Sequence, residues 1–165
     1  MSRTALSEPA AGIPAPAPAA GERGRFWRRL RTRFGPRRAE IVYSARYTFR
    51  FTGGLHDPLR GERVLAFLCQ EGLLHPSLLL VPDPVSWETL RSAHSDPYLE
   101  SLHEPGALAK VFGLPLSDDE TDQLITAQRT MAGGSILAAE RALASRGVAC
   151  NLGGGLHHAH FDRGQ

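Results

Sequence analysis

The chain has 165 residues, of which 42% are hydrophobic and 22% charged, and this balance excludes a wholly disordered chain, a collagen and a coiled coil. Two cysteines are too few for a disulfide-stapled scaffold or a cysteine-rich zinc finger, and they favour a reducing, cytoplasmic location. The net charge of +2 is the sum of +6 in residues 1–40 and −4 in residues 41–165. The basic pI therefore belongs to the leader, and we expect no specific nucleic-acid readout.

Residues 1–39 are predicted to be a disordered leader, followed by one domain at residues 40–165. The leader is first rich in Ala, Pro and Gly and then rich in Arg, a composition that favours an extended linker. Arginines of the second part surround apolar residues that fall near one helical face: Phe26, Trp27, Leu30 and Phe34. Two interpretations stay open, an unstructured leader and a short amphipathic helix that binds an anionic surface or an acidic partner.

The first half of the domain contains the predicted elements of a small sheet. Adjacent β-branched and aromatic residues predict a strand at residues 41–44, and the alternation in residues 46–51 predicts its extension or a second strand. Apolar residues at three-to-four spacing predict a helix over residues 60–74. The apolar run at residues 78–81 predicts another buried strand, which prolines terminate.

Helices dominate the next part of the chain. Ser86 is predicted to begin a helix that ends near His94, and a second helix begins around Asp96-Pro97. Residues 104–116 contain repeated Gly and Pro and are predicted to form a loop. A long helix is then expected over residues 117–146, with an acidic first turn.

Two features of this long helix affect the rest of the domain. The pair Gly133-Gly134 predicts either a break or close packing against a neighbour, and both alternatives stay open. Gly147 is predicted to be the C-cap, and residues 148–152 are predicted to form a buried strand. Cys69 and Cys150 lie in apolar runs and are expected to be buried thiols.

Helices that alternate with short apolar strands predict an α/β layered fold with a mostly parallel sheet. Ligands of such folds bind beyond the carboxyl ends of the strands. The segment after residues 148–152 contains a Gly triplet followed by His157, His158 and His160. Adjacent histidines suit acid–base chemistry or metal binding, and the alternative is a polar loop with exposed side chains.

Five segments share a resemblance to one known family, and their order along the chain matches it. They are IVYSARY, GERVLAFLCQEGLL, AHSDPYLESL, TMAGGSILAAERALASRGVA and NLGGGLHHAHFDRGQ. Together these segments resemble the histone deacetylase family, in particular its class IV and bacterial acetoin-utilisation-like branch. The resemblance covers residues 40–165 and implies a three-layer arginase/deacetylase-like α/β fold with only its N-terminal part present.

The family resemblance implies a zinc-dependent amidohydrolase that removes acetyl or longer acyl groups from lysine side chains or small amines. His157 and His158 correspond to tandem active-site histidines that hydrogen-bond a zinc-bound water. His158 is expected to be the main general base and acid, while His157 tunes the field and holds the water.

Substrate-binding roles follow from the same resemblance. Gly154 and Gly155 are expected to shape the wall of an acyl tunnel, Asp96 to bind the substrate backbone at the rim, and Arg60 to line an inner channel. From the residues alone, Asp96 is also a competent helix N-cap, and this alternative stays open. His94 is expected to be a structural hydrogen-bonding residue.

The metal ligands of the resembling family, an Asp-x-His pair and a later Asp, are expected beyond Gln165. We therefore expect this chain alone to be an inactive fragment of a Zn²⁺ enzyme. The alternative is a non-catalytic deacetylase-like interaction protein tethered through its Arg-rich leader. A further alternative is a small metal-binding module that uses His157, His158 and His160.

Overall fold

The computed structural model describes part of the chain, namely residues 39–49, 57, 59–104, 106–113, 115–154 and 159–164. The predicted leader lies outside these residues except for its last one, and so do His157, His158 and Gly155. The proposed domain boundary stays a prediction for the same reason. In the described ranges, no helix combines the length and apolar character needed to cross a membrane.

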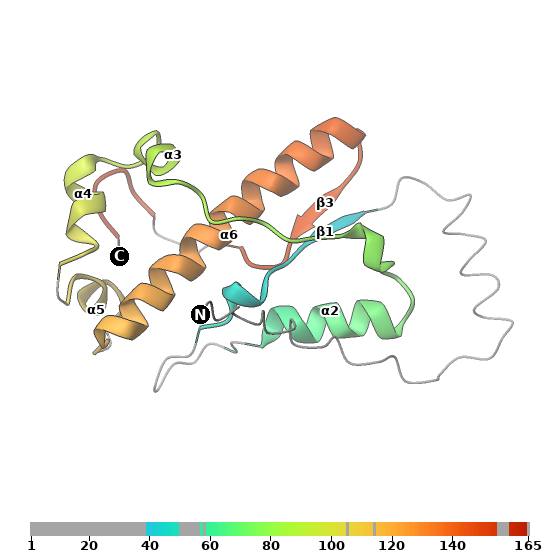
Figure 1. The fold of residues 1–165 in the computed structure, drawn as a ribbon, viewed down its shortest axis with the longest axis horizontal. Helices are drawn as coiled ribbons and strands as arrows, with labels where there is room; N and C mark the ends of the chain where they lie inside the picture. The colour runs from blue at the N-terminus through green and yellow to red at the C-terminus, as the bar shows by residue number, and fades with distance from the viewer. Residues whose placement is uncertain are drawn as a thin grey trace, which may run out of the picture.

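A small parallel sheet forms the centre of the structure (Figure 1). Its strands are β1 (Glu40–Val42), β2 (Leu79–Leu80) and β3 (Ala149–Asn151), in the order β2-β1-β3. Ile41 of β1 is in register with Leu79 on one side and with Cys150 on the other. The parallel pairing confirms the predicted α/β fold, because each return to the same edge of the sheet requires a crossover.

Helices make up most of the remaining described residues. They are η1 (Ala45–Tyr47), α2 (Arg60–Gln70), η2 (Pro76–Leu78), α3 (Trp87–Arg91), α4 (Asp96–Ser101), α5 (Ala107–Phe112) and α6 (Asp118–Ser145). The long helix α6 begins with a capping box, in which Ser117 and Glu120 satisfy each other's backbone N–H groups. The acidic first turn therefore marks the start of this helix, as the sequence predicts.

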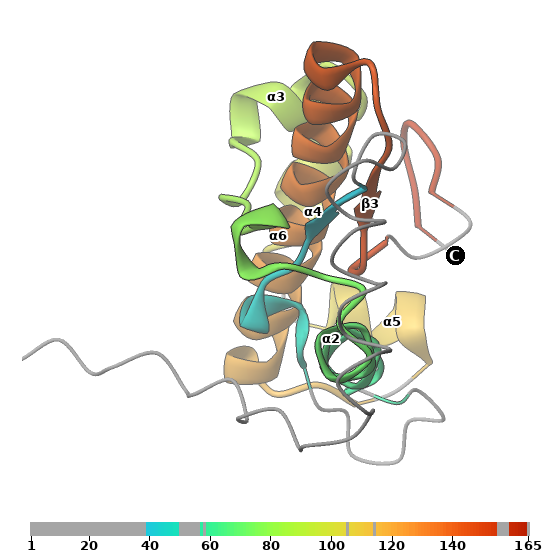
Figure 2. The ribbon, with the colours of Figure 1, turned by 90° about the vertical axis from the view of Figure 1, so that its right-hand side faces the viewer.

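The sheet lies between α6 and α2, which gives three layers (Figures 1 and 2). Successive residues of a strand point to opposite faces. Asn151, in register with Val42, hydrogen-bonds to α6, so this face of the sheet is turned towards α6. Ile41 and Tyr43 point the other way, and Tyr43 lies against the start of α2.

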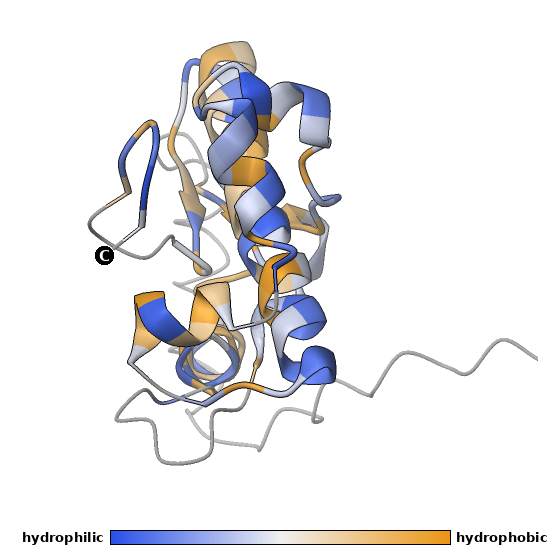
Figure 3. Cartoon of the chain, turned by 90° about the vertical axis from the view of Figure 1, so that its left-hand side faces the viewer, coloured by the Kyte–Doolittle hydropathy of each residue, from blue (hydrophilic) through white to orange (hydrophobic). Residues whose placement is uncertain are grey.

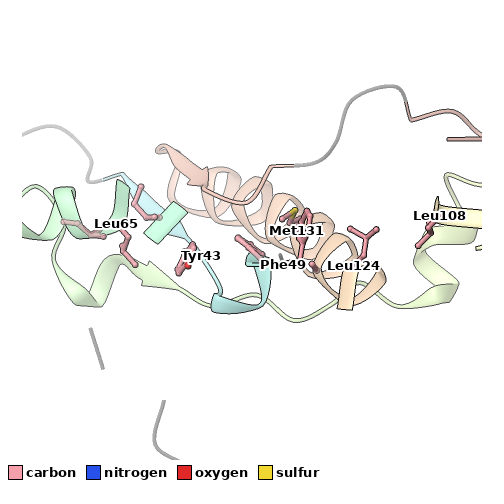
Figure 4. Packing of buried hydrophobic residues seen from close by; sticks show 10 residues of the cluster. Tyr43, Phe49, Leu65, Leu108, Leu124 and Met131 are labelled. Carbon is pink, nitrogen blue, oxygen red and sulfur yellow. The ribbon is translucent and has the colours of Figure 1, made fainter. Parts of the chain in front are cut away.

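The hydrophobic core runs along both sides of β1 (Figure 4). Tyr43 and Leu65 lie in the part of the core near α2, whereas Leu124 and Met131 are buried on α6. Leu124 is 1% exposed and Val42 is completely buried. Burial of a side chain of this size stabilises the fold by about 1.5–3 kcal/mol, so packing rather than sheet length holds the short strands together.

The predicted break at Gly133-Gly134 does not occur, and α6 is continuous through both residues. A side chain at Gly133 would collide with the backbone of Asp83, whose carbonyl carbon would lie 3.2 Å from the new Cβ. The Val85 N–H donates to the Arg129 carbonyl oxygen at 3.0 Å, which holds this loop across α6. Of the two alternatives, close packing is therefore correct.

Two predicted local structures are wrong. Residues 46–49, the described part of the predicted segment 46–51, do not extend the first strand, because η1 occupies Ala45–Tyr47, with Ser44 as its N-cap. Residues 104–116 are not one loop, because α5 lies within them between two left-handed glycines, Gly106 and Gly113. Glycines that read as a loop signal thus mark the two ends of a short helix.

The end of α6 and the strand after it also differ from the prediction. The left-handed residue is Arg146, with φ 48°, and not Gly147. Cys150 is exposed and Cys69 is only partly buried, so the expectation of two buried thiols is wrong. Among the described residues, β3 pairs only with β1, so its other edge is without a strand.

Candidate active site

The carboxyl end of β3 is fixed by the side chain of Asn151. Its Oδ1 accepts hydrogen bonds from the Tyr47 hydroxyl at 2.8 Å and from the Gly153 N–H at 3.1 Å. Its Nδ2 donates to the Met131 carbonyl oxygen at 2.9 Å and to the Ser135 Oγ at 3.1 Å. Every hydrogen-bonding position of this amide is thus used, and the strand end is joined to both η1 and α6.

Tyr47 lies between two glycines that leave no room for a side chain. A Cβ at Gly153 would be 2.5 Å from Tyr47 Cε2, and a Cβ at Gly134 would collide with the Tyr47 hydroxyl. Burial raises the pKa of Tyr47 to about 12, so its hydroxyl stays protonated and donates to Asn151 at neutral pH. The first turn after β3 is therefore held in one position.

Gly154 carries the chain out of this turn. It is exposed and has a φ of +58°, a left-handed conformation that glycine adopts without the steric cost of a side chain. No atom lies within 4 Å of a Cβ built at this position. Glycine is therefore favoured by the backbone conformation and not by a lack of room for a side chain. Its expected role in a tunnel wall stays a prediction, as does that of Gly155.

A second set of contacts holds the segment that follows the histidine pair, residues 159–164. His94 Nδ1 lies 2.9 Å from the His160 carbonyl oxygen, and the Ser95 N–H donates to the Phe161 carbonyl oxygen at 2.9 Å. Within the segment, the His160 N–H donates to the Arg163 carbonyl oxygen at 3.2 Å. These bonds confirm the structural role predicted for His94 and join the segment to the turn before α4.

The histidine pair therefore lies between two fixed flanks. Gly153 is bound to Asn151 on one side, and His160 and Phe161 are bound to the α3–α4 turn on the other. His157 and His158 themselves are outside the described residues, so their positions are not compared with the prediction. The two flanks limit the connection between them to residues 155–158.

Asp96 is the first residue of α4 and is exposed. The residue before it, Ser95, is the N-cap, so the interpretation of Asp96 as the N-cap is wrong. The Asp96 carboxylate accepts a hydrogen bond from Arg91 Nε at 2.8 Å. An exposed ion pair of this kind contributes only about 0–1 kcal/mol, so the carboxylate is available to an N–H donor of a substrate at little cost. Because Ser95 binds Phe161, Asp96 lies beside the segment after the histidine pair.

Arg60 is the first residue of α2 and is exposed. The start of α2 lies close to the sheet, because a Cβ at Gly61 would be 2.9 Å from Tyr43 Cε2 and 3.9 Å from the Leu152 carbonyl oxygen. The backbone at Arg60 is therefore next to the carboxyl ends of β1 and β3. The expected contribution of Arg60 to an inner channel stays a prediction.

The described residues do not fit a zinc site. Within the described ranges, no three His, Cys, Asp or Glu side chains lie close enough together to hold a metal ion. A catalytic zinc requires three protein ligands in addition to water. The expected zinc therefore has no set of ligands in the described part of the chain, and no geometry follows for it.

Sequence analysis missed Asn151 and Tyr47, which do the most to position the strand end. One signal for Asn151 was present, since an amide directly before a Gly triplet at a strand end is suited to bind the following turn. Tyr47 was assigned to a strand, so its hydroxyl had no predicted partner. Its contact with Asn151 joins residues 104 positions apart in the sequence.

Comparisons with known proteins agree with the resemblance. The family model for the histone deacetylase domain matches residues 55–165. A protein of Arabidopsis thaliana named Histone deacetylase 2 is 33% identical over 136 residues, which are 77% of this chain and 35% of that protein. An uncharacterised protein of Picosynechococcus is 30% identical over 124 residues, 72% of this chain and 39% of that protein.

The solved structure of a histone deacetylase homologue from Aquifex aeolicus has a similar fold. It superposes with a TM-score of 0.61 at 23% sequence identity, and the match covers 77% of this chain and 37% of that chain. This likeness confirms the arginase/deacetylase-like fold. The chain spans somewhat more than a third of the length of each relative that it matches.

Proposed function

This chain belongs to the histone deacetylase family, and on that basis we propose that it contributes a tandem-histidine site to the hydrolysis of an acylated amine. The matched region contains His157, His158, Asp96 and Arg60. An acylated lysine or an acylated small amine is the proposed substrate. The assignment to the class IV and bacterial acetoin-utilisation-like branch is part of this proposal.

The observation that carries the proposal is the pair of fixed flanks around residues 155–158. Catalytic side chains on a loop are effective only when a rigid scaffold positions them. Asn151 fixes the backbone before residues 155–158, and His94 together with Ser95 fixes the backbone after them. Chemistry at the carboxyl end of a parallel strand is also the general arrangement in α/β folds.

The two histidines have separate proposed roles. In amide hydrolysis, the oxygen of a water molecule bonds to the acyl carbon, and the bond from that carbon to nitrogen breaks. His158 accepts a proton from the water and donates it to the leaving amine nitrogen, so the products are a carboxylic acid and a free amine. His157 holds the water and tunes the local field.

Four other residues are proposed to contact the substrate. Asp96 accepts hydrogen bonds from the substrate backbone at the rim, as its exposed carboxylate allows. Gly154 and Gly155 form part of the wall, and Arg60 lines the inner channel. The zinc ion that the family resemblance implies stays a proposal without ligands among the described residues, and we assign no step to it.

The remaining expectations do not concern particular contacts in the structure. A cytoplasmic location, the absence of specific nucleic-acid readout and the inactivity of the isolated chain each stay a prediction. The alternative of a non-catalytic protein tethered by its leader gains no support, because the Arg-rich part of the leader is outside the described residues.

A chimera tests the proposed function directly. Residues 40–165 replace the matching segment of the Arabidopsis relative, and release of free lysine amine is measured on an acetylated peptide. We expect hydrolysis by the chimera, and a decrease in kcat of about a hundredfold or more for His158→Ala, since acid–base catalysis contributes at least this factor. The isolated chain is expected to be inactive.

The matched control is His75→Ala, because His75 is exposed and, among the described residues, its ring hydrogen-bonds to Ser77 in its own turn. Circular dichroism of each chimera checks that it is folded. A folded chimera that keeps its activity after His158→Ala would contradict the role of His158. A folded chimera without any activity, next to an active parent, would contradict the proposed function.

A further inference from the structure

A cavity of about 500 Å³ lies among the helices of the described residues. It is lined by residues of α3, α4, α5 and α6 and of the segment 159–164, and Figure 1 shows how these helices are arranged. Its volume is within the range of about 300–1,000 Å³ that small-molecule sites occupy. The ends of β1 and β3 do not line it, whereas His94 and residues of the segment 159–164 do, so the cavity adjoins one flank of the candidate active site.

Most of the cavity wall is apolar. The aliphatic side chains that line it come from four helices and include Leu90, Leu99, Leu108, Val111 and Ile125. Figure 3 shows hydrophobic segments on these helices next to hydrophilic ones. A wall of this kind favours the hydrocarbon part of a ligand through removal of apolar surface from water.

One wall of the cavity carries a cation with unused hydrogen-bond donors. The Arg129 guanidinium lies over the Trp87 ring, 4.7 Å from its centroid, and Arg129 Nε donates to the Val85 carbonyl oxygen at 2.9 Å. Both contacts fix the plane of the guanidinium. They leave its two terminal nitrogens, which are the donors that bind a carboxylate in the bidentate geometry.

No carboxylate of the described residues neutralises Arg129. The ion pairs that these residues form involve Arg63, Arg91, Arg141 and Arg163 instead. A partly buried, positioned arginine at the edge of an apolar cavity therefore offers a site for an external anion. The Trp87 ring also packs against the His103 ring, and their centroids are 5.0 Å apart.

We propose that this cavity binds a small amphipathic carboxylate, with its anionic end on Arg129 and its hydrocarbon part among the leucine, valine and isoleucine side chains. The two halves of the site match the two halves of such a ligand in charge and in polarity. The proposal concerns binding only and involves no reaction. It goes beyond the proposed hydrolysis and does not depend on it.

Binding of octanoate to the full 165-residue chain tests this proposal. The chain contains two tryptophans, Trp27 and Trp87, so a Trp27→Phe background makes Trp87 fluorescence specific for the cavity. We expect a saturable change in fluorescence with octanoate, and calorimetry gives the stoichiometry. Octan-1-ol, with the same hydrocarbon chain and no charge, is expected to bind at least about tenfold more weakly, because it lacks the charge-assisted hydrogen bonds.

Two variants locate the ligand. Arg129→Met keeps the aliphatic contact with Trp87 and removes the charge, and it should weaken octanoate binding by about tenfold or more. Ala132→Leu keeps Arg129 and fills part of the cavity, so it should also weaken binding. Arg146→Asn is the control, because it removes an exposed charge from the other end of α6 and asparagine tolerates the left-handed conformation there.

Each outcome decides the proposal. Weaker binding in both cavity variants, with Arg146→Asn unchanged, would support it. Equal affinity for octanoate and octan-1-ol, or the absence of saturable binding by the parent chain, would overturn it. If Arg129→Met does not fold, as thermal unfolding would show, then Ala132→Leu and the comparison of the two ligands still give the answer.

Discussion

The two sides of α6 are packed in opposite ways. On one side, Gly134 is in close contact with Tyr47 and Asn151, and hydrogen bonds join all three neighbouring elements. On the other side, Ala132 lines a cavity of about 500 Å³ between short helices. Gly134 therefore lies where there is no free space, whereas Ala132 lies where there is enough space for a ligand.

This difference corresponds to the two proposals, hydrolysis near the strand ends and ligand binding in the cavity. A hydrolytic site needs side chains held in one geometry, and the contacts at the strand end supply that rigidity. A binding cavity needs apolar space and a few positioned polar groups, and the short helices around Arg129 supply those. Substitutions that affect one region and not the other test whether the two are independent.

The largest effect is expected from adding one methyl group at Gly134. In Gly134→Ala the new Cβ would lie 2.8 Å from Asn151 Oδ1 and closer still to the Tyr47 hydroxyl. Overpacking of this kind costs about 1–3 kcal/mol or more, and the better helix propensity of alanine recovers about 1 kcal/mol. We expect a net decrease of about 2 kcal/mol in the free energy of unfolding, measured by urea denaturation.

Ala132→Leu is the matched comparison, because it adds a larger group to the cavity side of the same helix. Its effect on stability should stay below about 1 kcal/mol, since the new atoms enter free space. In the double variant Gly134→Ala/Tyr47→Phe, loss of the hydroxyl should remove part of the collision and give a measurable coupling. Equal costs for Gly134→Ala and Ala132→Leu would contradict the contrast between the two sides.

A smaller effect is expected from deprotonation of Tyr47 at high pH. Its pKa is raised from 10.0 to about 12 by burial, so the folded state keeps the proton over a pH range in which the unfolded state has lost it. The stabilisation is complete below pH 10 and is lost as the pH rises towards 12. In this window the free energy of unfolding should fall by up to about 1.4 kcal/mol per pH unit.

Tyr47→Phe provides the reference for this measurement. Burial also raises the pKa of Tyr43 and of Tyr98, so the parent and the variant share those contributions. The difference in the free energy of unfolding between parent and variant should be constant below pH 10 and should change above it, because only the parent loses the contribution of Tyr47. A constant difference over the whole alkaline range would mean that Tyr47 does not titrate in this way.

The smallest effect is expected in the segment 159–164, which follows the histidine pair. His94→Phe keeps a ring beside Tyr98 and removes the hydrogen bond to the His160 carbonyl oxygen, a change of about 1 kcal/mol. Hydrogen exchange at the Ser95 amide, which donates to Phe161, should become faster. His75→Phe is the control, because its hydrogen bond lies within one turn. Unchanged exchange at Ser95 in His94→Phe would show that His94 does not hold the segment.

Several features were predictable from local sequence because their causes are local. Ser117 and Glu120 satisfy each other's backbone groups within one turn, so the start of α6 is visible as a short motif. The apolar runs around Ile41 and Leu79 form strands because such residues suit a sheet that is buried on both faces. The five segments that resemble the family, in their order along the chain, were sufficient to identify it, and the comparisons confirm it.

The wrong predictions concern residues whose state depends on distant neighbours. Gly106 and Gly113 look the same in the sequence whether they belong to a loop or lie at the ends of a helix. The burial of Leu108 between them favours the helix. Tyr47 belongs to a turn because its hydroxyl reaches Asn151, far along the chain. Cys150 lies in an apolar run and is nevertheless exposed, because burial depends on what packs over the strand and not on the strand's own sequence.

The sequence by itself determined the alternation of helices and strands, the position of the tandem histidines after a strand, and the family. These follow from periodicity, caps and motifs, which depend on residues within a few positions of each other. Only the tertiary structure decided three further features. Gly134 leaves room for Tyr47 and Asn151, Asp96 lies beside the segment 159–164, and Arg129 lines a cavity. Each of these depends on contacts between residues distant in sequence, and their distances are set by how the helices pack on the sheet.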